Sequence, residues 1–294
     1  MHERENYMRY KYLRFPGGKI KAVTLSYDDG VRADIRLAGI LNSYGMKCTF
    51  NLNSSHVLSG TNPGKLNADE VREHMINAGH EIAVHGKCHI APGIADSVVA
   101  IRDVLACREE LEGEFDMIIR GMAYPDSGIT RIHTGNSYDE IKSYLNSLGI
   151  VYSRSLSGDN NSFMLPQDFY SWIPTAHHNN QNLLKWAQEF VDIPTAPTVF
   201  TRAYPRLFYL WGHSYEFDNN NNWDIIEKFC EIIHGRDDTW YATNIEIYDY
   251  VTAYASLITS ADGKTIYNPT VHEVFMCVDG KNYSVKSGQT IKIQ

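Results

Sequence analysis

Short runs of hydrophobic residues alternate along this chain with longer segments in which hydrophobic residues recur at helical spacing. The short runs predict buried strands at residues 21–27, 48–52, 81–84, 117–124, 150–153 and 207–211. The longer segments predict helices at residues 34–44, 67–79, 95–112, 137–148, 181–191, 223–233 and 245–258. Strands that alternate with helices pair in parallel, and the helices form the crossovers. The pattern therefore predicts an α/β fold, either a (β/α) barrel, complete or incomplete, or an open doubly wound sheet.

The C-terminal segment has a different pattern. Residues 271–278 and 282–293 are rich in strand-forming residues, and Asp279-Gly280 and Ser287-Gly288 mark turns. We therefore predict that residues 1–260 form the (β/α) domain and that residues 261–294 form a small β appendage. The appendage holds no cluster of catalytic residue types.

The formal net charge is −8 and the isoelectric point is about 5.8, so the chain lacks the basic character of a nucleic-acid-binding protein. No stretch approaches the roughly 18 apolar residues of a membrane span, and the N-terminus has no apolar signal-peptide core. Five dispersed cysteines argue against a disulfide framework. We expect no nucleic-acid or membrane partner and a cytoplasmic location, although a secreted protein without its leader would look the same. The sequence leaves the oligomeric state open, a homodimer included.

Two adjacent carboxylates, Asp28 and Asp29, lie just past the end of predicted strand 21–27. At the rim of a parallel sheet, one carboxylate can bind a metal while its neighbour, which points in another direction, acts as a base. The alternative is an acidic turn or N-cap before helix 34–44.

Two histidines, His85 and His89, follow predicted strand 81–84. At spacing i and i+4 they share one face of a helical turn and can bind one ion. A pair of histidines in a polar loop is the alternative. Cys88 lies between them, but its side chain is expected to point away from the face that they share.

His213 after strand 207–211, and Tyr124-Pro125-Asp126 at the end of strand 117–124, are weak signals alone. Because the carboxyl ends of parallel strands meet at one rim, we expect these groups to lie with the carboxylates and the histidine pair. One carboxylate and two imidazoles form a three-ligand site with room for water, which is typical of a catalytic metal. A second carboxylate and a third imidazole remain as base and acid.

These motifs resemble those of the polysaccharide deacetylase family, carbohydrate esterase family 4, with its NodB homology domain. Residues 26–30 match its Thr/Ser-Phe/Tyr-Asp-Asp-Gly motif, residues 85–89 its His-Ser/Thr-x-x-His motif, and residues 210–213 its late Leu-x-x-His motif. The resemblance covers about residues 20–255. It implies a distorted (β/α) barrel with fewer than eight regular strands, and hydrolysis of an acetyl group, usually from an N-acetylglucosamine unit.

The resemblance also implies a role for each motif residue. Asp29, His85 and His89 hold the metal, which polarises the acetyl carbonyl and lowers the pKa of its bound water. Asp28 is the general base, and His213 is the general acid that protonates the leaving amine.

Other positions depart from the family pattern. The Arg-Pro-Pro-Tyr motif aligns with residues 123–126, so the arginine that orients the base is replaced by Ala123. The backbone N–H of Asp126 is still expected to stabilise the oxyanion. Gly86 replaces the Ser or Thr of the second motif, and the fourth motif could not be located. The expected substrate-binding residues are Tyr124, Pro125, Asp126, Trp211 and Trp172.

The pair His177-His178 is expected to serve in a loop or a cap. Adjacent residues do not face the same way, which argues against a shared ligand role. The alternatives are contact with the substrate or a replacement partner for Asp28.

The leading hypothesis is a metal-dependent carbohydrate deacetylase, a hydrolase acting on carbon–nitrogen bonds other than peptide bonds. It would remove acetyl groups from an N-acetylated or O-acetylated sugar or oligosaccharide. The expected cofactor is a divalent metal, first Zn²⁺, with Co²⁺ or Ni²⁺ as alternatives. Two other hypotheses are an amidohydrolase acting on a non-sugar amide and a non-catalytic carbohydrate-binding protein. Retention of Asp28 and His213 argues against the last, because binding alone needs neither.

Overall fold

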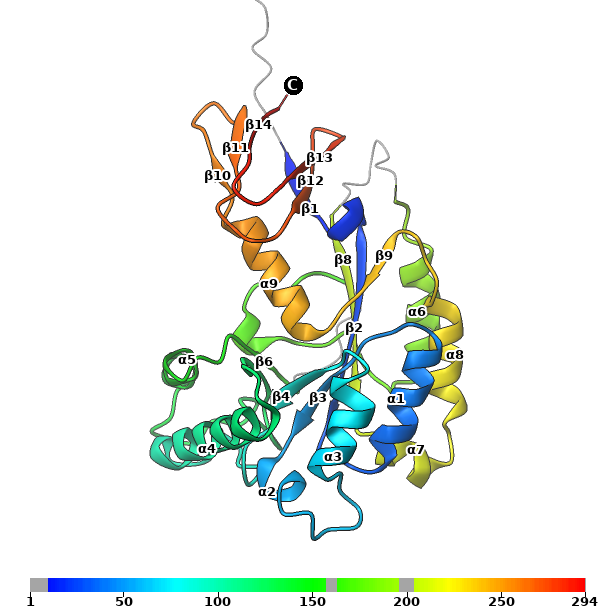
Figure 1. The fold of residues 1–294 in the computed structure, drawn as a ribbon, viewed down its shortest axis with the longest axis vertical. Helices are drawn as coiled ribbons and strands as arrows, with labels where there is room; N and C mark the ends of the chain where they lie inside the picture. Colours follow the sequence, from blue (N-terminus) through cyan, green and yellow to red (C-terminus); the bar gives the residue numbers. More distant parts are fainter. Residues whose placement is uncertain (1–9, 157–162, 196–203, 294) are drawn as a thin grey trace, which may run out of the picture.

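The computed structural model describes residues 10–156, 163–195 and 204–293. Its largest unit is a curled, eight-stranded parallel sheet with helices packed around it (Figure 1). The strand order is β6-β5-β4-β3-β2-β8-β7, and β9 also pairs with β2. Within the described ranges no ladder joins β6 to β7, so the sheet is a distorted, incomplete (β/α) barrel, as predicted. The strands are β2 (Lys21–Asp28), β3 (Thr49–Leu52), β4 (Glu81–Val84), β5 (Gly121–Ala123), β6 (Tyr152–Arg154), β7 (Ala176–His177), β8 (Arg206–Gly212) and β9 (Thr239–Tyr241).

The helices lie between successive strands in the chain and cover the outside of the sheet (Figure 1). None of them, in the part of the chain that the structure describes, combines the length and apolar character that crossing a membrane requires. They are α1 (Ala33–Ser43), α2 (Ser54–Val57), α3 (Ala68–Val71) with the π-helix Arg72–Ile76, α4 (Ser97–Phe115), α5 (Tyr138–Ser147), α6 (Leu183–Val191), α7 (Tyr215–Asn220), α8 (Asp224–Ile233) and α9 (Asn244–Ala255).

Alternation along each strand gives the sheet an apolar outer face and a more polar inner face. On β2, Val23, Leu25 and Tyr27 pack into the large core beneath the outer helices. Ser26 and Asp28 point the other way, into the barrel, where both are hydrogen-bonded to the same asparagine of β3. The same alternation turns several side chains at or just beyond the carboxyl ends of other strands inward: Asn51, His85, Arg154, Trp211 and His213.

The small β unit takes strands from both ends of the described chain. β1 (Lys11–Arg14) pairs with β12 (Val274–Val278), and β12 pairs with β13 (Lys281–Val285). A second sheet contains β10 (Ile258–Thr259), β11 (Thr265–Tyr267) and β14 (Thr290–Lys292). The predicted division at residue 260 assigns β1 and β10 to the barrel domain, whereas the structure pairs both with appendage strands. A lone hairpin is only marginally stable, and these added strands complete two three-stranded sheets.

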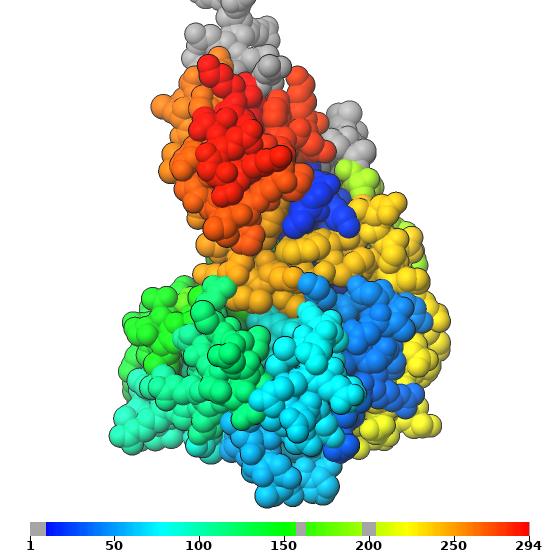
Figure 2. All heavy atoms as spheres, in the orientation of Figure 1, coloured from blue at the N-terminus to red at the C-terminus, as the bar shows by residue number. Residues whose placement is uncertain are grey.

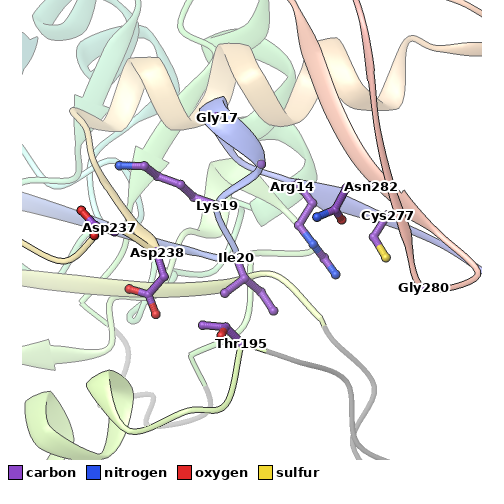
Figure 3. Close-up of a pocket in the computed structure, with 11 residues that line it drawn as sticks. Arg14, Gly17, Lys19, Ile20, Thr195, Asp237, Asp238, Cys277, Gly280 and Asn282 are labelled. Carbon is purple, nitrogen blue, oxygen red and sulfur yellow. The ribbon is translucent and has the colours of Figure 1, made fainter.

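The appendage lies at the end of the barrel where the strands begin (Figures 1 and 2). A cavity of about 390 Å³ lies at this junction, and Arg14, Lys19, Cys277 and Asn282 are among the residues that line it (Figure 3). The carboxyl ends of the strands, which carry the predicted catalytic groups, are at the opposite end of the barrel.

Some short elements differ from the prediction. The strand expected at residues 117–124 is reduced to β5, and the helix expected from residue 67 is a short α-helix followed by a π-turn. Seven α-helices and strands of the described chain were not predicted: β1, α2, β7, α7, β9, β10 and β11. Each has six residues or fewer, which is too short for a periodic pattern to be recognised.

Candidate active site

Asp28 is the last residue of β2, and Asp29 begins the turn that follows. Asp28 is buried, whereas Asp29 is partly exposed and has a left-handed backbone with φ of 80°. This conformation is strained for a non-glycine residue and is often found at functional sites. The N–H of Asp29 donates to the carbonyl of Asn51 at 3.0 Å, and Lys65 Nζ donates to the Asp29 carbonyl at 3.0 Å. The strained turn is therefore held from two sides.

Asp29, His85 and His89 bring three candidate ligand atoms within 4.8 Å of one another. The Nε2 atoms of both histidines lie 3.7 Å from Oδ1 of Asp29. Nδ1 of His85 is 2.9 Å from the carbonyl of Ala123, which can only accept, so Nδ1 carries the proton and Nε2 the lone pair. This Nε2 is buried and has no hydrogen-bond partner among the described residues. A buried lone pair beside a carboxylate and a second imidazole fits a divalent cation.

The turn between the two histidines is held by Asp103 of α4. Its carboxylate accepts the backbone N–H of Cys88 at 2.7 Å, and a Cβ atom at Gly86 would lie only 2.3 Å from Oδ2 of Asp103. Gly86 has φ of 73° and His89 has φ of 60°. The absence of a side chain at position 86 thus leaves room for the carboxylate that anchors this turn. Cys88 is exposed and lies outside the ligand group.

The carboxylate of Asp28 is held by two side chains from other strands. Asn51 Nδ2 of β3 donates to Oδ1 at 2.8 Å, and the Arg154 guanidinium of β6 forms a hydrogen-bonded ion pair with Oδ2. Burial would raise the pKa of Asp28, but the charge of Arg154, together with His85, outweighs it and lowers the pKa below its ordinary value. Asp28 is therefore an oriented, ionised carboxylate in a buried site.

His213 lies on the other side of this carboxylate. Its Nε2 is 3.8 Å from Oδ2 of Asp28, and Nε2 of His85 is 3.9 Å from the same oxygen. Its Nδ1 lies 3.0 Å from Oε1 of Glu216 on α7. Burial would lower the pKa of His213, but the hydrogen bond to Glu216 and the charge of Asp28 outweigh it and raise the pKa above its ordinary value. The site therefore pairs an ionised carboxylate with an imidazole whose protonated form is favoured.

A second group of potential ligands, His177, His213 and Glu216, lies beside the first. The backbone N–H of Asn179 donates to Nδ1 of His177 at 3.2 Å, so the ring proton of neutral His177 is on Nε2, which faces Glu216 at 3.4 Å. A metal at that Nε2 would displace this proton and leave Nδ1 facing a donor. These three side chains therefore lie close together because of the hydrogen bonds around Glu216, and their arrangement does not indicate a second metal.

The five expected substrate-binding residues have different environments. Tyr124 and Pro125 are buried, and the hydroxyl of Tyr124 donates to the carbonyl of Tyr170. Asp126 is exposed, with φ of 48°, and its backbone N–H has no hydrogen-bond partner in the described ranges, so it remains available to an oxyanion. Trp211 is partly exposed, and its ring stacks on the guanidinium of Arg154 at 4.2 Å.

Trp172 does not line the cleft. Its side chain is buried in the inner core of the barrel, where it packs against Tyr152, Phe169 and Tyr209. The expectation that it contacts substrate is therefore wrong for this side chain. A bulky indole directly after a short 3-10 helix, Phe169–Ser171, is drawn into the core because burial of its apolar surface stabilises the fold.

Part of the chain is similar to a known protein family. Residues 15–152 match the family model described as polysaccharide deacetylase. This part of the chain is therefore similar to the polysaccharide deacetylase family. The match ends before β8, so His213 lies outside it. No curated protein sequence matches the chain.

Solved structures share the fold of this chain. A probable polysaccharide deacetylase from Pseudomonas aeruginosa PAO1 aligns with 14% identity and a TM-score of 0.58, over 80% of this chain and 92% of that one. The PuuE allantoinase aligns with 12% identity and a TM-score of 0.57, over 80% and 91%. The Streptococcus pyogenes deacetylase PplD aligns at 16% identity over 46% of this chain, which spans only 55% of that protein, with a TM-score of 0.40.

Two residues of this site were missed by the sequence motifs. Arg154 supplies the guanidinium that Ala123 cannot, and it does so from the neighbouring strand β6. Arg154 directly follows the predicted strand 150–153, as Asp28 follows its strand, so its position at the rim was the available signal. Glu216, three residues after His213, had no such signal, because α7 was not predicted. His177 and His178 contact Glu216 and not Asp28.

Proposed function

We propose that this protein is a divalent-metal-dependent hydrolase that removes acetyl groups from an N-acetylated or O-acetylated sugar or oligosaccharide. The observation that carries the proposal is the position of Asp28, whose Oδ2 lies between Nε2 of His85 and Nε2 of His213, at 3.9 and 3.8 Å. This arrangement supports the assignment of Asp28 as a base that lies between a metal ligand and an acid. Members of carbohydrate esterase family 4 generally depend on a divalent metal.

Asp29, His85 and His89 would hold the cation. When bound there, the cation would polarise the acetyl carbonyl and make water more acidic; zinc, cobalt and nickel all suit these ligands. The ionised Asp28 accepts a proton from the attacking water through Oδ2. Its hydrogen bonds to Asn51 and Arg154 keep the other lone pairs occupied and hold the carboxylate in one orientation.

The leaving group and the oxyanion are served by other residues. Nε2 of His213 donates a proton to the departing nitrogen or oxygen, which avoids expulsion of a strongly basic anion. The N–H of Asp126, which has no hydrogen-bond partner among the described residues, stabilises the negative charge that develops on the acetyl oxygen. Trp211, partly exposed beside Arg154, offers an aromatic surface for the sugar ring.

The experiment measures acetate release from chitooligosaccharides and from acetylated xylan by protein loaded with zinc, cobalt or nickel. We expect Asp28→Asn to reduce turnover about 10²–10⁴-fold with metal still bound, and Asp29→Ala to lose metal and activity together. Hydrolysis by Asp28→Asn at the wild-type rate would falsify the assignment of the base.

A second candidate is hydrolysis of a non-sugar amide, because the PuuE allantoinase shares the fold. Ring opening of a cyclic amide releases no acetate, so the same metal-loaded protein separates the two candidates. Consumption of a cyclic amide without acetate release from any acetylated sugar would favour the second.

A further inference from the structure

Glu216 lies directly behind His213, on the side of the ring away from Asp28. Oε1 of Glu216 is 3.0 Å from Nδ1 of His213, and Nε2 across the ring is 3.8 Å from Oδ2 of Asp28. We propose that Glu216 is a positioning residue that holds the His213 ring with Nδ1–H directed to its carboxylate and Nε2 directed into the cleft. The inference rests on the proposed function, in which His213 is the general acid.

The carboxylate of Glu216 is itself fixed by two more histidines. Its Oε2 lies 3.0 Å from Nε2 of His178 and 3.4 Å from Nε2 of His177. Burial lowers the pKa of both histidines, so both are neutral at ordinary pH, and Nδ2 of Asn179 donates to the same Oε2 at 2.6 Å. Although partial burial would raise the pKa of Glu216, the imidazole hydrogen bonds hold it well below its ordinary value. Glu216 is therefore an ionised acceptor with three imidazoles around it.

The position of His178 shows that this arrangement is built into the fold. His178 is fully buried, and its ring stacks between Phe217 at 4.1 Å and Tyr27 at 5.7 Å. A Cβ atom at Gly212 would lie 2.0 Å from Nδ1 of His178, so the ring occupies space that only glycine leaves open. Gly212, which directly precedes His213, thus leaves the space that the His178 ring needs to lie beside Glu216.

Charged and titratable groups face His213 from every side of the cleft. Asp28 and Asp29 approach from the end of β2, and Glu216 is the carboxylate nearest to Nδ1. The hydrogen bond to Glu216 is the largest of the contributions that raise the pKa of His213, ahead of the charges of Asp28 and Asp29, so its loss should lower that pKa. The remaining groups around the ring are His177, His178, Tyr215 and, behind Trp211, Arg154.

The test uses the zinc-loaded full chain with Glu216→Gln, which keeps an acceptor oxygen but removes the charge, and Glu216→Ala, which removes both. Nitrogen-15 NMR of the histidine rings reports the titration and the tautomer of His213 without any turnover. We expect the His213 titration to move to lower pH by about one unit or more in both variants, and the Nδ1–H preference to be lost only in Glu216→Ala.

Kinetics of the same proteins provide the second readout. The alkaline limb of the pH profile of kcat/KM should move to lower pH, and kcat should fall at least about tenfold while KM and zinc content stay near wild type. His178→Phe keeps the ring stacking and removes the contact to Glu216. It should therefore shift the His213 titration less than either Glu216 substitution does. Glu231→Gln, on the exposed surface of α8, is the matched control and should change neither readout.

The outcomes separate this inference from the proposed function. An unchanged His213 titration and tautomer in both Glu216 variants overturns the positioning role, whether or not the wild type releases acetate. If the titration moves as expected but no acetylated sugar is hydrolysed, the orientation by Glu216 stands and the proposed function fails. A substitution that unfolds the protein is recognised by its NMR spectrum, and Glu216→Gln, nearly identical in shape, then decides the result.

Discussion

The guanidinium of Arg154, at the end of β6, forms a buried ion pair with Asp28, at the end of β2, and stacks on the ring of Trp211 at 4.2 Å. The two charged residues are 126 positions apart in the chain. The family motif that normally begins with an arginine begins here with Ala123, which is fully buried and too small to reach Asp28. A guanidinium therefore reaches Asp28 from a different strand.

Arg154→Met should lower both activity and stability. Removing one partner leaves an uncompensated buried carboxylate, so we expect the free energy of unfolding to fall by about 3–5 kcal/mol and turnover to fall about 10²-fold or more. Urea unfolding and acetate release measure the two effects. The double variant Asp28→Asn/Arg154→Met should recover part of the stability but none of the activity. If the double variant is no more stable than Arg154→Met, the ion pair is not the cause.

Gly86→Ser, which restores the residue usual in the family, should be harmful here. The added Cβ would meet Oδ2 of Asp103 at 2.3 Å, and φ of 73° is unfavourable for serine. We expect a loss of about 1–3 kcal/mol in unfolding free energy and weaker zinc binding, measured by titration calorimetry. Gly39→Ser on α1, where no atom lies within 4 Å, is the control. Adding Asp103→Ala to Gly86→Ser should relieve the clash; no relief would contradict this explanation.

Glu81 should make stability depend on pH between about 4.5 and 7. Although this buried carboxyl accepts hydrogen bonds from Tyr152 and Thr49, burial dominates and raises its pKa from 4.5 to about 7. The folded state thus holds the proton more tightly than the unfolded state. This contribution is fully present below pH 4.5 and is lost as pH rises to 7, by about 3 kcal/mol in all.

Comparison with Glu81→Gln tests this contribution. The unfolding free energy of the wild type, relative to that of Glu81→Gln, should decline from pH 5 to pH 7 and then remain level, as followed by urea unfolding. Glu231→Gln, an exposed surface change, should run parallel to the wild type. A relative stability that rises with pH would show that Glu81 is ionised throughout.

The two tryptophans near the site should respond differently to truncation. Trp172→Ala removes a ring from the inner core and should cost about 3–5 kcal/mol, with kcat per folded molecule retained. Trp211→Ala uncovers the guanidinium of Arg154 and should cost less stability, about 0.5–2 kcal/mol, but lower kcat/KM about tenfold or more. Thermal unfolding and acetate release at low substrate concentration measure these effects. Equal effects of both substitutions on kcat/KM would contradict the separate roles.

Local patterns determined the main features of the fold. Hydrophobic runs such as residues 81–84 identified strands, and the capping box at Asn67 identified the start of a helix, because both depend on neighbouring residues. The same reasoning did not detect β9, whose three residues pair with the beginning of β2. Nor did it show that β1 joins β12, because that pairing spans nearly the whole chain.

The sequence by itself determined that Asp29, His85 and His89 could form one site, because the ends of parallel strands meet at a common rim and each residue follows a strand. Only the tertiary structure decided which side chains support that site. Arg154 reaches Asp28, and Glu216 reaches His178, through contacts between elements that have no fixed separation in sequence. Such contacts depend on how strongly the sheet curves and on whether each side chain points into or out of the barrel. A local sequence motif determines neither property.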